Sequence, residues 1–567
     1  MATLQRRTGT IFAVLFALLA IAGIRVLYLG TVHSGALRRD AAAEHETIES
    51  VPAPRGTITD RLGTVLAVSE PADDVSAVPD LVKQPLEAAK KLAPLLDMST
   101  SEVLAKLSEQ TTFVYLAKNV PAARAKQIEE LRIDEKSTDG TVEEKPIEGI
   151  EETPTMRRVY PRGTLASQVL GELGTEGKGL SGLEYSENSV LSGHEGQRRV
   201  ISDALGQPIS ITDSQRESSG KSVQLTLDAN IQHRAEQVLG AVGSVFKPTS
   251  ATAIVMNPRT GAVLAMANWP QVNANDTAGA SSSELQNQAV SFLYEPGSTF
   301  KLVTFSGALE EGLITPETTF QVPDEITIDG TTIHDAEPHP EETLTAGEIL
   351  AHSSNVGTIK IGALLGAEKF NKWVHRWGFG ARTGIDLPGE ESGEVISPSE
   401  YSGVSMGNLP IGQGEAVTPI QIATAYSAVA NGGILRTPHV IARVGGRRVA
   451  LPKGHRVIKA STAAEMRKMM EGVLAPGGTA SEVSIPGYKL AGKTGTANKV
   501  DPETGEYSET AFVGSFVGFA PANNPKLLAA VIVNEPTTGS YYGTTVAAPA
   551  WGQIMAFALP YLGIAPE

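Results

Sequence analysis

One short stretch, from Glu295 to Lys301, places a lysine at the start of an apolar segment. It reads E-P-G-S-T-F-K. The residues that follow, Leu302 to Leu309, predict a largely apolar helix, and Pro296-Gly297 predicts the turn that leads into it. Ser298 and Lys301 are three positions apart, so on a helix their side chains share a face. A helix N-terminus also presents free N–H groups and a positive dipole end to a developing negative charge. This pattern indicates a serine nucleophile with a lysine as its base.

The Ser-x-x-Lys spacing alone is weak evidence, because it recurs elsewhere in the chain. Ser218 and Lys221 show it in a polar, glycine-containing stretch that precedes a strand-like run. Ser244 and Lys247 show it as well, but Pro248 follows and disfavours helical geometry at Lys247. Only the spacing that begins at Ser298 opens an apolar helix. The alternative there is a solvent-facing serine and lysine near a helix start.

Two further motifs follow along the chain. Ser353-Ser354-Asn355 lies in L-A-H-S-S-N-V-G-T, and Lys493-Thr494-Gly495-Thr496 lies in Y-K-L-A-G-K-T-G-T-A. Ser-x-Asn is weak on its own, since Ser186-Glu187-Asn188 matches it too, whereas Lys-Thr-Gly occurs once. The three motifs in this order are the set found in penicillin-binding proteins and serine β-lactamases. The chain resembles a class B penicillin-binding protein, and more narrowly the division-specific (septal) peptidoglycan D,D-transpeptidase family.

Composition limits the other possibilities. The chain has 567 residues and a formal net charge of −16, so two or more domains are expected and nucleic acid is an improbable partner. It contains no cysteine, which excludes disulfides, thiol catalysis and cysteine-ligated metals. We interpret the scattered polar residues His334, Asp335, His339 and His352 as loop residues rather than a metal site. We expect no metal and no cofactor.

The N-terminus predicts a membrane anchor. From Ile11 to Leu29 the only charged residue is Arg25, and the run is close to the roughly 20 residues that span a bilayer. Arg25 lies near one end, where its side chain can reach the interface. A buried core helix and a cleaved signal peptide are the alternatives. Arg6 and Arg7 favour a cytoplasmic N-terminus, so we expect a single-pass protein of the cell (inner) membrane whose catalytic part is extracytoplasmic.

Residues 31–220 differ in pattern from the rest of the chain. The stretch P-R-G-T-I-T-D-R-L-G, from Pro54 to Gly63, resembles the start of a class B pedestal (dimerisation-like) domain. We predict a strand, a turn and a strand there, with Arg55, Asp60 and Arg61 available as an ion-pair clasp. The segments from Arg158 to Gly171 and from Gly179 to Gly206 continue the family pattern.

Two other segments of this region carry local predictions. Asp80 to Gln110 has helical spacing, and Ser99 with Glu102 forms a capping-box pattern. Ile133 to Glu152 is acidic and polar. We interpret this second segment as a solvated loop, with a docking surface for a partner as the alternative.

Residues 221–567 predict an α+β fold. Alternating and apolar runs predict strands, with helices between them. The strands are at 223–228, 251–255, 262–266, 516–520 and 527–533; the helices are at 229–239, 346–365 and 420–430. Strands at both ends with a helical middle indicate an antiparallel sheet covered by helices. By resemblance this is the serine β-lactamase/transpeptidase-like domain, which follows an anchor at 1–30 and the elongated pedestal domain at 31–220.

The resemblance implies a role for each motif residue. Ser298 would attack the penultimate D-Ala carbonyl of a peptidoglycan stem peptide, and an amine of a neighbouring stem would take the acyl group. A free lysine is almost fully protonated at neutral pH, so Lys301 must be desolvated or lie near another cation, for which Lys493 is the candidate. Ser353 would relay the proton to the leaving amine. Asn355 would hold Lys301 and the substrate amide.

The Lys-Thr-Gly motif predicts the edge of a strand, where Gly495 allows a close backbone approach and substrate can add as an extra strand. By resemblance, backbone N–H groups of Ser298 and Thr496 would form the oxyanion hole. Lys493, Thr494 and Thr496 would bind the substrate carboxylate.

Several functions remain open from the sequence. A D,D-carboxypeptidase uses the same residues, a β-lactamase adds rapid deacylation, and an elongation-type transpeptidase shares the architecture. A non-catalytic β-lactam-binding scaffold is the alternative of another class. The Gly179–Gly206 spacing and the segment Ser515–Pro521 resemble the septal group more. Expected partners are D-Ala-D-Ala stem peptides, β-lactams as covalent inhibitors, a membrane lipid II polymerase and other division-machinery proteins.

Overall fold

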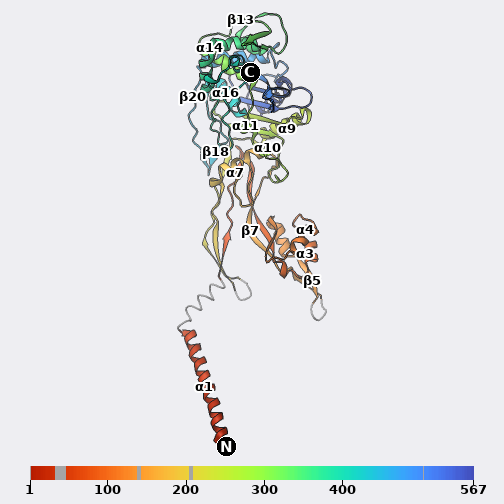
Figure 1. The fold of residues 1–567 in the computed structure, drawn as a ribbon, viewed down its shortest axis with the longest axis vertical. Helices are drawn as coiled ribbons and strands as arrows, with labels where there is room; N and C mark the ends of the chain where they lie inside the picture. The colour runs from red at the N-terminus through yellow and green to blue at the C-terminus, as the bar shows by residue number, and fades with distance from the viewer. Residues whose placement is uncertain (1, 32–45, 137–141, 203–207, 502) are drawn as a thin grey trace. The chain divides into compact units, whose positions relative to one another are not determined.

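The computed structural model describes residues 2–31, 46–136, 142–202, 208–501 and 503–567 (Figure 1). It begins with helix α1 (Ala2–Thr31). Within the part of α1 from Arg7 to Thr31 a stretch of 18 residues has a mean hydropathy of 2.5, so this part is long and apolar enough to cross a membrane. The apolar helix expected from Ile11 to Leu29 is therefore present.

The chain divides into two compact units, each assembled from separate stretches of sequence. The first comprises Met1–Arg55, Glu70–Arg157 and Gly193–Gly220, and the second comprises Gly56–Ser69, Arg158–Ser192 and Lys221–Glu567. Strand β3 (Val65–Ala77) contributes residues to both units.

A small α/β core lies in the first unit. Helices α3 (Pro85–Leu92) and α4 (Thr100–Leu107) pack together, and β4 (Val114–Pro121) leads into α5 (Ala122–Glu129). Their buried side chains include Leu92, Val103, Leu107, Leu116 and Ile128. Ser99 and Glu102 form the predicted capping box at the start of α4.

The described residues of the acidic segment from Ile133 to Glu152 are largely strand rather than loop, so that prediction was wrong for them; residues 137–141 lie outside the described residues. It contains β5 (Arg132–Lys136) and β6 (Val142–Pro146), which pair with each other, and the start of β7 (Ile150–Val159). The buried residues Ile133 and Ile147 face the core while acidic neighbours face solvent. The segment has so few apolar residues that the alternation of apolar and polar positions typical of a strand is not visible in its sequence.

A three-stranded antiparallel sheet completes the first unit. It has the order β1 (Glu46–Val51), β8 (Gly196–Ser202) and β9 (Pro208–Gln215). The residues 203–206 of the predicted family segment lie outside the described residues.

The strand-turn-strand prediction for Pro54–Gly63 is confirmed, but the ion-pair clasp is wrong. Strand β2 (Ile58–Thr59) pairs with β3. Asp60 caps the turn between them, because its carboxylate accepts the N–H groups of Leu62 and Thr64, each at 2.8 Å. Arg61 pairs instead with the buried Asp228, with Nε and Oδ2 2.7 Å apart.

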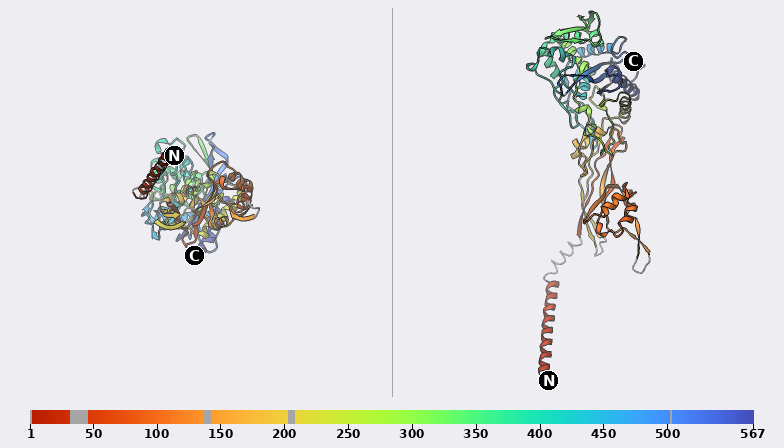
Figure 2. Two further views of the ribbon diagram at one scale, coloured as in Figure 1. Left: turned by 90° about the horizontal axis from the view of Figure 1, so that it is seen from below. Right: turned by 45° about the vertical axis from the view of Figure 1, so that its right-hand side comes forward.

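A five-stranded antiparallel sheet forms the centre of the second unit. Its order is β12 (Val263–Trp269), β11 (Ser250–Met256), β23 (Leu527–Asn534), β22 (Tyr507–Ala520) and β21 (Ala491–Val500). Both termini of the unit thus supply strands, as predicted. In Figure 2 the blue C-terminal strands and the green helices lie in the same compact unit.

Helices cover both faces of this sheet, because side chains alternate between the two faces of every strand. Val531 and Val533 pack in one core with α9 (Ala229–Phe246) and α19 (Ala548–Tyr561). Ala530 and Ile532 pack in a second core with α12 (Lys301–Glu310), α16 (Pro419–Ala430) and α17 (Ala460–Glu471). The α+β prediction of an antiparallel sheet covered by helices is confirmed.

The single helix predicted at 346–365 is two helices. They are α13 (Ala346–His352) and α14 (Asn355–Arg376), separated at Ser353-Ser354. The remaining elements are short: α6 (Ser167–Leu170), α7 (Gly182–Ser186), α8 (Asn188–Leu191), β10 (Val223–Leu225), α10 (Ser282–Leu285), α11 (Gln288–Ser291), β13 (Thr319–Val322), β14 (Glu325–Ile328), β15 (Thr331–His334), β16 (Glu342–Thr345), α15 (Ser405–Asn408), β17 (Ile434–Leu435), β18 (Ile441–Val444), β19 (Arg447–Arg448), β20 (His455–Arg456) and α18 (Gly543–Val546).

A buried ion pair in the second unit gives a stability prediction. Arg158 Nε lies 2.7 Å from Glu184 Oε1, and the two side chains are 4% and 0% exposed. We expect Arg158→Ala to lower the free energy of unfolding by about 3–5 kcal/mol, because it removes the guanidinium that donates to the fully buried Glu184 carboxylate. Urea unfolding of the full chain in detergent measures the change.

The exposed pair Lys178–Glu176 provides the control, with side chains 74% and 75% exposed. We expect Lys178→Ala to change the unfolding free energy by only about 0–1 kcal/mol. Equal effects of the two substitutions would contradict the argument from burial.

Candidate active site

Ser298 lies on a single 3₁₀ turn, Gly297–Phe300, that runs directly into α12. Three residues complete one turn of a 3₁₀ helix, so Ser298 and Lys301 point to the same side. Ser298 is partly exposed, whereas Lys301 is fully buried. The predicted helix start is confirmed, with the serine one turn before the regular helix.

Two glycines let this turn pack closely, one against strand β21 and the other against the segment that ends at Gly412. Gly297 has a φ of +52°, and a Cβ there would lie 2.7 Å from the carbonyl oxygen of Thr496. A Cβ on Gly412 would lie 2.1 Å from the carbonyl oxygen of Gly297, whose own N–H donates to Gly412 O at 3.0 Å. The serine turn therefore contacts the Lys-Thr-Gly strand through bare backbone.

Lys301 is held by uncharged acceptors. Its Nζ donates to Asn355 Oδ1 at 2.9 Å and to the carbonyl oxygens of Ser353 and Ser354 at 2.5 and 3.1 Å. Burial lowers the pKa of Lys301 to about 7, while the negative charge of Asp335 acts in the opposite direction. A substantial fraction of this amine is therefore neutral near pH 7 and can accept a proton.

Ser353 connects Lys301 with the second lysine. It adopts the left-handed conformation, with a φ of 62°, between the end of α13 and the start of α14. Its Oγ accepts from Lys493 Nζ at 2.8 Å and from Lys301 Nζ at 3.3 Å. One hydroxyl thus lies between two buried lysines.

Lys493 belongs to β21, at the edge of the five-stranded sheet, and is fully buried. Burial, and secondly the positive charge of Lys301, lower the pKa of Lys493 well below its usual value. Two ammonium groups so close in an apolar setting repel each other, so the pair releases one proton readily. The sequence-based expectation that the two lysines lie together is met.

The rest of the Lys-Thr-Gly motif is packed on one side and lies at the sheet edge, as predicted. Thr494 Oγ1 lies 2.9 Å from Thr479 Oγ1, and Thr496 Oγ1 accepts the N–H of Gly543 at 3.1 Å. A Cβ on Gly495 would lie 2.4 Å from Ser515 Oγ, so only glycine fits there.

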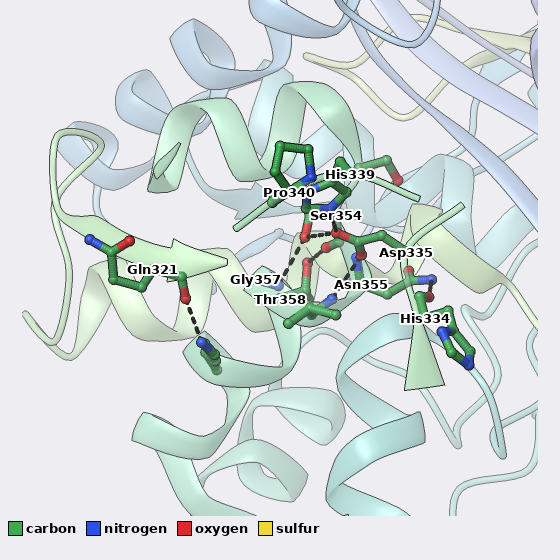
Figure 3. Close-up of polar contacts among 12 residues, drawn as sticks. Gln321, His334, Asp335, His339, Pro340, Ser354, Asn355, Gly357 and Thr358 are labelled. Atoms are coloured by element: carbon green, nitrogen blue, oxygen red, sulfur yellow. Dashed lines mark hydrogen bonds and ion pairs between the residues drawn. The ribbon is translucent and has the colours of Figure 1, made fainter. Parts of the chain in front are cut away.

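Asp335 is a site residue whose role the sequence did not reveal. Its Oδ2 accepts the Ser354 hydroxyl at 2.7 Å, and its Oδ1 accepts the N–H groups of Val356, at 3.0 Å, and Asn355 (Figure 3). His339 Nε2 lies 3.0 Å from Oδ2. Asp335 therefore caps the N-terminus of α14 and fixes the backbone on which Ser353 and Asn355 stand.

No local signal marks this cap, because strand β16 and helix α13 lie between Asp335 and α14 in the sequence. His334 belongs to β15, and its carbonyl oxygen accepts from Asn355 Nδ2 at 3.0 Å. Our interpretation of these residues as a loop was thus incomplete, since they hold the second motif in place.

Comparison with known proteins identifies the family. The family described as "Penicillin binding protein transpeptidase domain" matches residues 251–556, and "Penicillin-binding Protein dimerisation domain" matches residues 50–225. The chain is 33% identical over 560 residues to "Probable peptidoglycan D,D-transpeptidase PenA" of Neisseria gonorrhoeae, covering 98% of this chain and 92% of the relative. This chain is a class B penicillin-binding protein.

Other relatives of this penicillin-binding protein agree. It is 32% identical over 565 residues to "Peptidoglycan D,D-transpeptidase FtsI" of Escherichia coli, covering 98% of this chain and 91% of the relative. The crystal structure of penicillin binding protein 3 from Mycobacterium tuberculosis in complex with ampicillin has a TM-score of 0.69 and 28% identity. That match covers 92% of this chain and 97% of the other.

The penicillin-binding protein brings its three motifs together in one site of the second unit, and the contacts of that site include neither of the other two Ser-x-x-Lys pairs. Ser218 lies in the first unit, where its N–H bonds His194 O. Lys247 has a φ of 45° and ends α9, as Pro248 predicts.

Within the described residues, Ser298 Oγ makes no hydrogen bond to Lys301. The Lys301 amine donates instead to Ser353, Ser354 and Asn355. Catalytic hydrogen bonds often tighten only when substrate binds.

The electrostatics of Lys301 can be measured directly. We expect its Nζ to titrate near pH 7 in lysine side-chain NMR of the full chain in detergent. Because the Asp335 carboxylate stabilises the protonated amine, we expect Asp335→Asn to move this titration to lower pH.

Asp329→Asn is the matched control. Asp329 lies in the β14–β15 turn with a φ of 47°, which asparagine tolerates, so the titration of Lys301 should not move. A midpoint near pH 10, or equal shifts in the two variants, would contradict the assignment.

Proposed function

We propose that this penicillin-binding protein is a septal peptidoglycan D,D-transpeptidase that acts through an acyl-enzyme on Ser298. The observation that carries the proposal is the Ser353 hydroxyl held between the two buried lysines, beside the turn that carries Ser298. Such a group can move a proton from the nucleophile to a leaving amine without water. Relatives named peptidoglycan D,D-transpeptidases support the same chemistry.

The first half-reaction forms the acyl-enzyme. Ser298 Oγ transfers its proton to neutral Lys301 and attacks the carbonyl carbon of the penultimate D-Ala of a stem peptide. The tetrahedral intermediate collapses, the C–N bond to the terminal D-Ala breaks, and the proton passes through Ser353 to the leaving amine. Asn355 holds Lys301 and the substrate amide.

The second half-reaction makes the cross-link. An amine of a neighbouring stem attacks the Ser298 ester and loses a proton to the same relay, and the Ser298 hydroxyl is restored. Backbone N–H groups of Ser298 and Thr496 form the oxyanion hole, where one lost donor costs about 10²–10³ in rate in a studied protease.

Substrate lies along β21 as an added strand. The exposed backbone edge of β21 supplies main-chain hydrogen bonds, while Lys493, Thr494 and Thr496 bind the substrate carboxylate. Gly495 keeps the strand close enough to its neighbours for this geometry. β-Lactams acylate Ser298 in the same position, as the ampicillin-bound neighbour suggests.

The rest of the chain anchors the catalytic domain to the membrane and positions it. We infer that residues 1–30 form the cytoplasmic tail and anchor, 31–220 the pedestal, and 221–567 the extracytoplasmic catalytic domain of a single-pass inner-membrane protein. The apolar α1 and the matched dimerisation domain support this division. Partners are a membrane lipid II polymerase and other division-machinery proteins.

Labelled penicillin tests the nucleophile. We expect one stable adduct on Ser298, located by peptide mass, and no adduct in Ser298→Ala. Ser218→Ala and Ser244→Ala are the controls, and both should acylate at the normal rate. Acylation that survives Ser298→Ala would overturn the assignment, whereas rapid hydrolysis of the adduct would indicate a β-lactamase.

The septal role has its own test in the host bacterium. We expect a fluorescent fusion to gather at the division site and depletion of the protein to give filaments. A Ser298→Ala fusion should localise equally well without restoring division. Uniform lateral localisation and rounded cells would instead indicate an elongation-type transpeptidase.

A further inference from the structure

The chain contains a long basic segment that the proposed function does not use. Between Glu415 and Glu465 there is no aspartate or glutamate, although the whole chain has a net charge of −16. The same interval holds Arg436, Arg443, Arg447, Arg448, Lys453, Arg456 and Lys459. Such a charge distribution creates a local positive potential on an acidic protein.

One end of this segment lines a hollow of about 360 Å³ in the second unit. Three arginines from separate elements line it: Arg259 from the β11–β12 turn, Arg436 just after β17, and Arg467 from α17. Asn431, Asn523 and Asn524 add polar groups, and no acidic residue is among the lining residues. None of the proposed catalytic residues lines it.

The three guanidinium groups make no ion pair with a carboxylate among the described residues, although Glu471, one turn along α17, acts electrostatically on Arg467. Arg436 Nε is buried without a hydrogen-bond partner. Arg467 Nη1 donates to Val429 O at 3.2 Å, and Arg259 donates to Asn524 Oδ1. A buried, unpaired donor on a cation is costly, so an acceptor that enters the hollow gains from pairing with it.

The walls of the hollow are fixed without any ligand. Asn431 Nδ2 donates to Pro258 O at 2.8 Å and to Ile434 O at 2.7 Å. Ser427 Oγ donates to the same Pro258 carbonyl at 3.1 Å. These bonds connect the β11–β12 turn to the end of α16 and to β17. The backbone segments that carry Arg259 and Arg436 are therefore held in place before a ligand binds.

A second, smaller hollow of about 240 Å³ shares Arg436 with the first. It is lined by Arg382, Lys453 and His455 as well, again with no acidic residue among its lining. The positive surface therefore continues from one hollow to the next through Arg436, which suits a ligand with more than one charged unit.

We propose that the hollow formed by Arg259, Arg436 and Arg467 is a binding site for a phosphate group. Three arginines that line one hollow match the charge and the several oxygens of a phosphoryl group better than a single carboxylate, which one arginine fork can satisfy. The phosphate can belong to a phosphodiester polymer of the cell envelope or to a phospholipid headgroup. The site is independent of transpeptidation.

Phosphate binding tests the site on the full chain in a neutral detergent. Calorimetry with inorganic phosphate should show saturable binding, weakened about tenfold by Arg436→Gln and by Arg467→Gln, since each removes charged hydrogen bonds. Arg467→Lys keeps the charge but loses the fork, and should weaken binding less than Arg467→Gln. All three variants should react with labelled penicillin at the wild-type rate, which shows that they fold and separates this proposal from the catalytic one.

Arg234→Gln is the control, because Arg234 is a half-buried arginine of α9 that does not line the hollow and whose Nη1 donates to Gln237 Oε1 at 3.1 Å. Absence of saturable binding to the wild type, or an equal loss in Arg234→Gln, would overturn the proposal. Two further probes assign the source of the ligand. Tighter binding of poly(glycerol phosphate) than of phosphate indicates an envelope polymer, and tighter binding of dihexanoyl phosphatidylglycerol indicates a lipid headgroup.

Discussion

The contact of Lys301 and Lys493 with one serine hydroxyl is the constraint on which the second unit depends. Each lysine is fully buried, and an isolated ammonium in an apolar interior is costly unless acceptors surround it or it loses its proton. The protein supplies acceptors without supplying a bonded carboxylate. Ser353 and Ser354 carbonyls and the Asn355 amide serve Lys301, and the Ser353 hydroxyl serves both lysines. The arrangement needs α13 and α14 to break where they do, because only the left-handed Ser353 turns its hydroxyl and carbonyl to the same amine.

Close backbone contacts then bring the three motifs together. The lysines belong to a helix in the middle of the chain and to a strand near its end. The 3₁₀ turn reaches β21 because Gly297 has no side chain, and the segment at Gly412 reaches the turn because Gly412 has none. Strand β21 reaches its own neighbours because Gly495 has no side chain. Sheet pairing of β21 with β22 holds Lys493 in register, with Lys493 opposite Val517. The two lysines can therefore be buried together because the glycines at 297, 412 and 495 allow the surrounding backbone segments to pack closely.

Sequence patterns predicted those helices, strands and caps whose formation depends on residues close to one another in the sequence. The strands at 251–255 and 527–533, the helix after Ser298 and the capping box at Ser99 are of this kind, and the structure has them. Predictions failed where partners are distant in sequence. Asp60 and Arg61 have different partners from the expected ones, and Asp335 caps a helix that begins many residues later. The prediction for the paired strands β5 and β6 failed for another reason, since most of their positions are charged residues and the sequence shows no apolar alternation there.

Asp335 shows how one carboxylate serves two purposes that oppose each other electrostatically. As a helix cap it must be negative, and that charge stabilises the ammonium form of Lys301, which is the form that cannot act as a base. Burial of Lys301 outweighs this effect, so its pKa falls to about 7 and no further. A base with a pKa near the operating pH combines a useful neutral fraction with the strongest pull on the proton of a hydroxyl. The carboxylate under the second motif thus moderates the desolvation of Lys301 as well as placing Ser353 and Asn355, and the reactivity of the site is set by the balance between burial and that one charge.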